Sequence, residues 1–377
     1  MELPPLERQD DMMMAEIRPY LLDPREDYPE PYYMLEYNGV PFSAIGGIQA
    51  ISGQKKNGKS FVLTQLMAAI LGNGTERVER YLPGLRVPER TIEYLGHQPS
   101  VLYVDTEMEK LNSAKVLRRV HWLCGWDMKQ PNDRLNVLWL RTVEDDPESK
   151  ERAFEKRFRL IRQAIDLLHP DIVFIDGVRD IIGDFNDNAE SAALIIRLMA
   201  IAEKRGICIW NALHMNPRPG NDDDSKMRGH LGTELGNKVT DTLASVKEKK
   251  DGNVTFTVKQ LDARGKDMDD WKFEITDDAG NLGVPRIISQ SAARTVPIEH
   301  DTEEDILAWI NEAIDKFEWP LSRVNVKKKV FGEIGGVKND SRQQADLMIA
   351  INLKYLVEST IKSGGYYKLM PAEDLPF

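Results

Sequence analysis

Residues 53–60 read Gly53-Gln54-Lys55-Lys56-Asn57-Gly58-Lys59-Ser60, and this stretch decides the fold. An apolar run from Ile48 to Ile51 precedes it, and an apolar helical pattern from Phe61 to Leu71 follows it. The motif G-x-x-x-x-G-K-S between a strand and a helix predicts a phosphate-binding loop, whose backbone N–H groups turn toward phosphate oxygens. A glycine-rich surface turn is the alternative interpretation, and the flanking strand and helix argue against it.

This loop predicts a site for ATP and Mg²⁺. The Lys59 ammonium is expected to reach the β- and γ-phosphates, and the Ser60 hydroxyl is left to ligate Mg²⁺. The predicted nucleotide-binding residues are Gly53, Gln54, Lys55, Lys56, Asn57, Gly58, Lys59, Ser60 and Phe61.

A second motif runs from Asp171 to Asp176 and reads as an apolar strand that ends in a carboxylate. In a parallel sheet the carboxyl end of such a strand lies beside the phosphate loop, so Asp176 is predicted to hold the hydration shell of Mg²⁺. The alternative is a buried strand whose final Asp176 only begins the turn with Gly177.

A third motif, from Val101 to Glu107, is a strand followed at once by Asp-x-Glu. It resembles the RecA-type ATPases, in which a glutamate just past the second core strand orients and deprotonates the attacking water. The resemblance implies that Glu107 is the catalytic base. In the alternative, Asp105, Glu107 and Glu109 are only a solvated helix N-terminus, where acidic residues suit the helix dipole.

Strand and helix patterns alternate from about residue 45 to residue 213, which predicts a mostly parallel sheet covered on both faces. The expected strands are 48–52, 101–105, 137–140, 171–176 and 207–213, and the expected helices are 60–71, 108–123, 154–168 and 189–204. Short strands at 239–248, 254–260 and 271–275 are expected to add antiparallel edge strands. The predicted fold class is therefore α/β, with the core of a RecA-like P-loop NTPase.

Four regions are predicted along the chain. Residues 1–40 are rich in Pro, Tyr and acidic side chains and are expected to form an irregular arm that wraps the core or a neighbouring subunit. The ATPase domain is expected over 41–285, and a linker over 286–300. Residues 301–377 predict three helices and a hairpin with a turn at 363–365, an order that resembles a winged-helix domain.

Residues 45 to about 280 resemble the hexameric helicase branch of the RecA-type ATPases, the RepA-like and DnaB-like proteins of plasmids and mobile elements. The resemblance implies a ring of identical subunits, possibly of six members. It implies that His214 senses the γ-phosphate and that Arg264 reaches the ATP of the neighbouring subunit, where it neutralises developing charge. The lysine expected two residues before Arg264 is replaced by Asp262. A solvated loop histidine and an ordinary turn arginine are the alternatives.

DNA contacts in this superfamily come from loops that face the centre of the ring. The candidates are 183–188 and 216–232, and the second loop holds Arg218, Lys226, Arg228 and His230 together with three acids, Asp222 to Asp224. A solvated loop is the alternative. In the terminal region, a basic face on a recognition helix is suggested by Arg323, Lys327, Lys328, Lys329, Lys338 and Arg342. It is expected to bind single-stranded DNA, another protein or the ring's own subunits.

Composition narrows the class of protein. A net charge of −11 argues against a protein that coats nucleic acid with its whole surface, although a ring can keep a basic lining in its channel. Cys124 and Cys208 lie in apolar contexts, so we expect buried thiols and a cytoplasmic protein. The acidic N-terminal residues lead us to expect no signal peptide, and the short apolar runs lead us to expect no membrane span. A regulatory KaiC-like ATPase and an accessory ATPase of recombination or transposition remain as alternatives to a helicase.

Overall fold

The computed structural model describes residues 6–28, 30–215, 227–250, 252–288, 301–338, 340–363 and 366–372. The chain divides into two compact units, Met1–Ile288 and Ser289–Phe377, and each is described by itself. No helix in the described ranges combines the length and the apolar content that crossing a bilayer requires.

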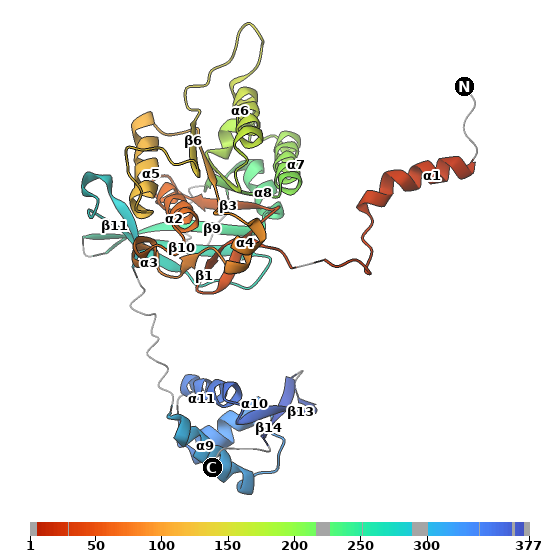
Figure 1. The fold of residues 1–377 in the computed structure, drawn as a ribbon, viewed down its shortest axis with the longest axis vertical. Coiled ribbons are helices and arrows are strands. Elements are labelled where there is room, and N and C mark those ends of the chain that lie inside the picture. The colour runs from red at the N-terminus through yellow and green to blue at the C-terminus, as the bar shows by residue number, and fades with distance from the viewer. Residues whose placement is uncertain are drawn as a thin grey trace. The chain divides into compact units, whose positions relative to one another are not determined.

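A nine-stranded sheet forms the centre of the first unit, in the order β12-β11-β10-β9-β3-β8-β7-β5-β6 (Figure 1). Six strands are parallel to one another: β3 (Ile48–Gly53), β5 (Val101–Asp105), β6 (Leu135–Trp139), β7 (Ile172–Asp176), β8 (Cys208–His214) and β9 (Asp241–Lys250). Three continue the edge in antiparallel order: β10 (Asn253–Ala263), β11 (Trp271–Thr276) and β12 (Val284–Ile288). The predicted α/β fold, with a mostly parallel sheet and antiparallel edge strands, is confirmed.

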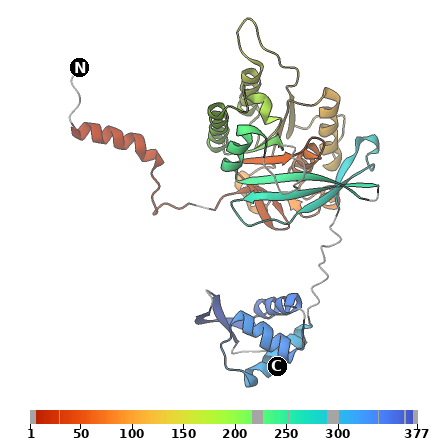
Figure 2. The same cartoon turned by 180° about the vertical axis from the view of Figure 1, so that it is seen from behind.

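Helices cover both faces of this sheet, which is why its central strands are apolar on both sides. The helices α2 (Lys59–Leu71), α3 (Glu76–Tyr81) and α5 (Lys110–Leu123) share one apolar core with the sheet. The helices α6 (Ala153–Leu168), α7 (Asn188–Arg205) and α8 (Gly229–Lys238) share the other, and Figures 1 and 2 show the two layers. Successive residues of a strand serve opposite cores: Tyr103 belongs to the first and Val104 to the second.

The region predicted as an irregular arm, 1–40, contains regular structure. It includes α1 (Leu6–Ile17), the 3₁₀-helix η1 (Arg18–Tyr20) and β1 (Tyr33–Tyr37). Strand β1 pairs with β2 (Val40–Ala44) and β4 (Leu85–Arg86) in a small antiparallel sheet. Asn38 and Gly39 make the β1–β2 turn with φ of 49° and 78°, as a two-residue hairpin requires.

Several short elements were not among the predictions: α3, α4 (Glu89–Leu95) and the 3₁₀-helices η2 (Val178–Ile181) and η3 (Gly280–Leu282). Strand β12 was not predicted either, and it extends to Ile288, inside the region predicted as a linker, 286–300. The candidate DNA loop 216–232 also differs from its prediction, because helix α8 begins at Gly229. Its segment 216–226 lies outside the described residues.

The second unit follows the predicted order of helices and hairpin. It contains α9 (Glu303–Lys316), α10 (Arg323–Asn325), the π-helix η4 (Val326–Ile334), α11 (Asp340–Asn352), β13 (Leu356–Ser363) and β14 (Tyr366–Pro371). The Thr302 hydroxyl caps α9 by accepting from the Asp305 amide at 3.1 Å. The second helix is mostly a π-helix, which its sequence did not predict. The winged-helix interpretation stays a prediction.

Both cysteines are buried and free, so neither thiol is expected to react in the folded protein. Burial raises the pKa of the Cys124 thiol to about 12 and keeps it protonated at neutral pH. Ellman's reagent should therefore label neither thiol in buffer and both thiols in denaturant. Rapid labelling of either cysteine under native conditions would contradict this packing.

Candidate nucleotide site

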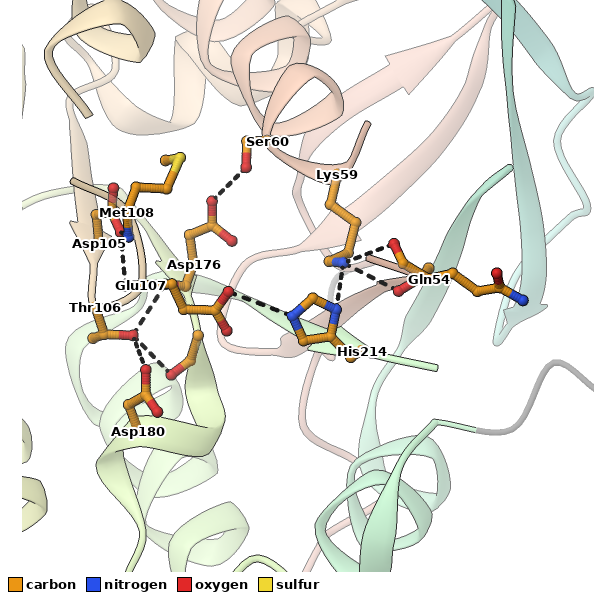
Figure 3. A network of polar contacts seen from close by, with 12 residues as sticks. Gln54, Lys59, Ser60, Asp105, Thr106, Glu107, Met108, Asp176, Asp180 and His214 are labelled. Carbon is orange, nitrogen blue, oxygen red and sulfur yellow. Dashed lines mark hydrogen bonds and ion pairs between the residues drawn. The ribbon is translucent and has the colours of Figure 1, made fainter. Parts of the chain in front are cut away.

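Four parallel strands bring the predicted site residues to one edge of the sheet. Strands β3, β8, β7 and β5 are consecutive neighbours and point the same way. Their carboxyl ends place the phosphate loop, His214, Asp176 and Glu107 side by side (Figure 3). Strand β8 separates β3 from β7. At the carboxyl ends of these strands the Ser60 hydroxyl donates a hydrogen bond to the Asp176 carboxylate.

The phosphate loop has a backbone that its glycines make possible. Gly58 has φ of 87°, and a Cβ there would lie 2.7 Å from the Phe256 ring of β10. The loop therefore rests on the antiparallel part of the sheet. Helix α2 begins directly after it at Lys59, so its unpaired N–H groups face the space that the loop encloses.

Lys59 lies inside its own loop. Its Nζ donates to the carbonyls of Gly53 at 3.1 Å and Gln54 at 3.4 Å, and to Nδ1 of His214 at 3.0 Å. Burial lowers the pKa of this ammonium. Neutral carbonyls are weak partners for a desolvated cation, and phosphate oxygens are much stronger ones. The arrangement therefore suits an ammonium that binds a triphosphate.

Ser60 and Asp176 form a candidate half-site for Mg²⁺. The Ser60 hydroxyl donates to Oδ2 of Asp176 at 2.9 Å, and the Tyr103 hydroxyl donates to the same oxygen at 2.8 Å. Burial raises the pKa of Asp176 to about 6, because it disfavours the ionised carboxylate. A bound cation would stabilise that ionised form. No group of three or more His, Cys, Asp and Glu in the described residues is arranged to hold a metal. These two hard oxygens therefore fit an ion that arrives with phosphate ligands.

Glu107 is linked to Lys59 through His214. Oε2 of Glu107 lies 3.4 Å from Nε2 of His214, whose Nδ1 faces Lys59. One tautomer satisfies both contacts, with Nδ1 accepting and Nε2–H facing the carboxylate. The hydrogen bond with His214 lowers the pKa of the Glu107 carboxyl, so it is ionised at neutral pH. An ionised carboxylate in this place can accept a proton from water.

The three acids of the Asp-x-Glu segment have separate surroundings. Asp105 is fully buried and accepts from the amides of Glu107 and Met108, both at 2.9 Å, and from the Ser113 hydroxyl. Glu109 forms an ion pair with Arg141 at 2.9 Å. Asp105 thus holds the start of α5, and Glu107 is the acid that faces Lys59. The three do not form one solvated helix N-terminus.

A supporting contact behind Glu107 was not predicted. The Thr106 hydroxyl lies 2.9 Å from Oδ2 of Asp180 and 3.1 Å from the Gly177 carbonyl. Gly177 has φ of 102°, and a Cβ there would lie 2.1 Å from Oγ1 of Thr106 and 2.9 Å from Cγ of Glu107. Only glycine fits between the ends of β5 and β7. The Asp176-Gly177 pair in the sequence was the available signal.

Gly177→Ala is expected to lower both stability and ATP turnover, because the methyl group must displace Glu107 or Thr106. The left-handed backbone alone costs about 1 kcal/mol for alanine, and the clash adds to it. Urea unfolding and steady-state hydrolysis measure the two effects. Gly96→Ala is the control, with φ of 68° and nothing within 4 Å of the added Cβ. Equal losses in both variants would contradict the role of the close contact.

Arg264 lies at the opposite end of the strands from the phosphate loop, beside the amino ends of β9 and β3. It follows the last residue of β10, and its amide donates to the carbonyl of Thr240, which precedes β9. Thr240 in turn binds the carbonyl of Ile48, at the start of β3. Arg264 is exposed and distant in register from its own phosphate loop. Within one chain the structure does not bring it to the other site residues.

The candidate DNA-binding residues are only partly described. Arg218, Lys226 and Asp222 to Asp224 lie outside the described residues. Met215 and Met227 pair, and the Arg228 amide donates to the His214 carbonyl at 3.0 Å, so the residues on either side of 216–226 lie beside His214. His230 lies in the first turn of α8. In the loop 183–188, the Phe185 ring contacts two arginines. Its centre lies 4.2 Å from Cζ of Arg179 and 5.6 Å from Cζ of Arg228.

The predicted basic face of the second unit is smaller than its sequence suggests. Arg323 forms an ion pair with Glu358 at 2.9 Å, and Arg342 pairs with Asp301. The three lysines at 327–329 lie on η4, where Lys328 is exposed and Lys329 lies 5.0 Å from the Phe317 ring. Of these basic residues, Lys328 and Lys338 are exposed.

One comparison with known proteins, a match to a family model, covers the candidate nucleotide site. Residues 39–217, just under half of the chain, match the family model described as "AAA domain". The matched segment includes the phosphate loop, Glu107, Asp176 and His214 and ends before Arg264, and it supports a P-loop ATPase domain. No curated protein sequence matches the chain. A solved structure, of the KaiC-like protein PH0186 from Pyrococcus horikoshii OT3, is 14% identical, with a TM-score of 0.43 over 68% of this chain and 98% of that one.

Proposed function

We propose that the chain is an ATP-hydrolysing motor that assembles as a ring and acts on DNA, in the manner of the RepA-like and DnaB-like helicases. The observation that carries the ATPase part is the Glu107–His214–Lys59 chain of contacts, in which an ionised carboxylate and the Lys59 ammonium contact opposite nitrogens of one imidazole ring. The DNA-directed part rests on the resemblance of the ordered motifs and on Met215 and Met227, which flank the candidate DNA loop and pair beside His214.

In this proposal each residue has one task at the γ-phosphate. Lys59 exchanges its loop carbonyls for phosphate oxygens, and the amides at the start of α2 bind the β-phosphate. Ser60 and Asp176 would hold Mg²⁺, and the bound ion would supply Lewis-acid stabilisation of charge on the phosphate oxygens. Glu107 orients a water and accepts its proton. His214 loses its contact with Lys59 once phosphate takes that place, and the Arg228 amide, which donates to the His214 carbonyl, couples that change to the start of α8.

Arg264→Ala should remove hydrolysis in the assembled protein while leaving ATP binding intact, because the guanidinium is proposed to act on the neighbouring subunit. Mixing Arg264→Ala subunits with Glu107→Gln subunits should restore part of the activity, since some interfaces then hold one intact base and one intact arginine. Lys266→Ala is the control for loss of a nearby exposed charge. Mixed assemblies without any recovered activity would contradict the shared site.

ATP hydrolysis with and without single-stranded DNA, measured beside the mass of the assembly, tests the DNA-directed part. Stimulation by DNA together with a closed oligomer is expected. An oligomeric ATPase whose hydrolysis rate is the same with and without DNA would instead favour a KaiC-like regulatory role. The net charge of −11 supports this second candidate. Stimulation by DNA without strand separation would favour the accessory role in recombination or transposition.

A further inference from the structure

Strand β10 contains a β-bulge close to its carboxyl end, just before Arg264. Gln260 and Asp262 are two residues apart, yet they pair with consecutive residues of β9, so Leu261 is an extra residue in β10. Successive side chains of a strand alternate between the two faces of a sheet, and one inserted residue therefore reverses the face of every residue after it. The bulge thus decides the face of the strand to which Arg264 belongs.

The bulge moves the even-numbered residues of β10 from one face of the sheet to the other. Before it, Phe256 belongs to the apolar core shared with α2. After it, Asp262 pairs with Thr242, and Thr242 pairs with Ala50 of β3, which belongs to the core shared with α6 and α7. Arg264 is two residues further along, so it follows Asp262 in the alternation and not Phe256.

The side chain of Gln260, at the bulge, connects the sheet to the segment that follows Arg264. Its Oε1 accepts from the Met268 amide at 2.8 Å, and its Nε2 donates to Oδ1 of Asp241 at 3.3 Å. Met268 is buried, so the chain that leaves the sheet at Arg264 returns to it at Met268. The Arg264 amide donates at 3.1 Å to the carbonyl of the residue that precedes β9. The exposed turn that begins at Arg264 is therefore held at both ends.

Asp241 fixes the orientation of the Gln260 amide. Asp241 is 4% exposed, and its Oδ2 accepts from the Ser43 amide at 2.8 Å and from the Thr240 hydroxyl at 3.3 Å. Its Oδ1 accepts from Gln260. An ionised carboxylate only accepts and a backbone N–H only donates, so the Gln260 amide satisfies Asp241 and Met268 in one orientation alone. A buried acceptor without its donor is costly, which favours that orientation.

We propose that Gln260 is a positioning residue for Arg264, and that it acts by holding the turn at the bulge. This inference rests on the proposed function, in which Arg264 reaches the ATP of a neighbouring subunit. The Arg264 side chain forms no ion pair with the described residues, so the backbone of the turn sets where its guanidinium can reach. A shift of about 1 Å in a positioned group can cost on the order of 10²-fold in rate.

Subunit mixing in the full chain tests the positioning role. Gln260→Met keeps the length of the side chain but removes the amide, so it should slow hydrolysis by roughly 10–10²-fold and leave ATP binding unchanged. Mixing it with Glu107→Gln subunits should restore activity, because these supply a well-placed Arg264. Mixing it with Arg264→Ala subunits should restore none, because neither partner supplies one. Gln98→Met, the same substitution at an exposed position, should behave as the unmodified chain.

Three results of these assays would overturn the proposal. The first is full activity of Gln260→Met. The second is recovery with Arg264→Ala subunits. The third is no recovery with Glu107→Gln subunits under conditions in which Arg264→Ala and Glu107→Gln subunits complement each other, because Gln260 would then act within its own subunit. Urea unfolding shows whether the variant is folded.

Hydrogen exchange separates this inference from the proposed function. The amides of Arg264 and Met268 should exchange faster in Gln260→Met than in Gln98→Met, because the turn loses its support. Unchanged exchange of both amides would overturn the role of Gln260. Faster exchange, together with no complementation between Arg264→Ala and Glu107→Gln, would support Gln260 as the residue that holds Arg264 and would contradict the shared site alone.

Discussion

Lys59→Ala is expected to abolish ATP binding or turnover, with a fall in kcat/KM of roughly 10²–10³-fold or more, because it removes the cation that faces the transferred phosphoryl group. The ammonium is desolvated and contacts two loop carbonyls and His214. Nucleotide binding by fluorescence and steady-state phosphate release measure the two losses.

The control for Lys59→Ala is Lys115→Ala, which removes an exposed lysine from α5 and should leave both measurements unchanged. Equilibrium unfolding shows whether the variant is folded. Undiminished hydrolysis by a folded Lys59→Ala protein would refute the assignment of the phosphate loop.

Glu107→Gln should keep nucleotide binding and slow hydrolysis by about 10²–10⁴-fold, the usual contribution of a positioned general base. Glutamine keeps the shape of the side chain and can still accept a hydrogen bond from Nε2 of His214, so the loss is confined to proton transfer. Single-turnover hydrolysis separates this step from product release.

Glu109→Gln is the matched control for Glu107→Gln, since it makes the same substitution two residues away on a side chain that pairs with Arg141. It should leave turnover unchanged. Normal turnover in Glu107→Gln would remove Glu107 as the base, and equal losses in both variants would point to an electrostatic effect of the whole segment.

The sequence predicted the parts of the fold that rest on short-range patterns. Apolar runs that end in Gly53, Asp105 and Asp176 read as buried strands, and β3, β5 and β7 are such strands. The convergence of their ends follows from parallel pairing, so the meeting of Ser60 with Asp176 could be expected. The chain of contacts through His214 could not, because it depends on side-chain rotamers across β8.

Other features carried a signal that was not used, or no signal at all. The Asn38-Gly39 pair between Tyr37 and Val40 is a strong hairpin signal, but the surrounding prolines and acidic residues favoured an irregular arm. The π-helix η4 has no sequence pattern that separates it from an α-helix. The bulge at Leu261 depends on the pairing of β10 with β9, which periodicity does not encode.

A crystal structure of Glu107→Gln with ATP and Mg²⁺ tests the central claim most directly. The account predicts a triphosphate inside loop 53–60, with Lys59 Nζ moved from the loop carbonyls to phosphate oxygens and Mg²⁺ beside Ser60 and Asp176. The side chain at position 107 should lie within one water of the γ-phosphate. Nucleotide bound elsewhere, or a residue 107 turned away from the γ-phosphate, would contradict it.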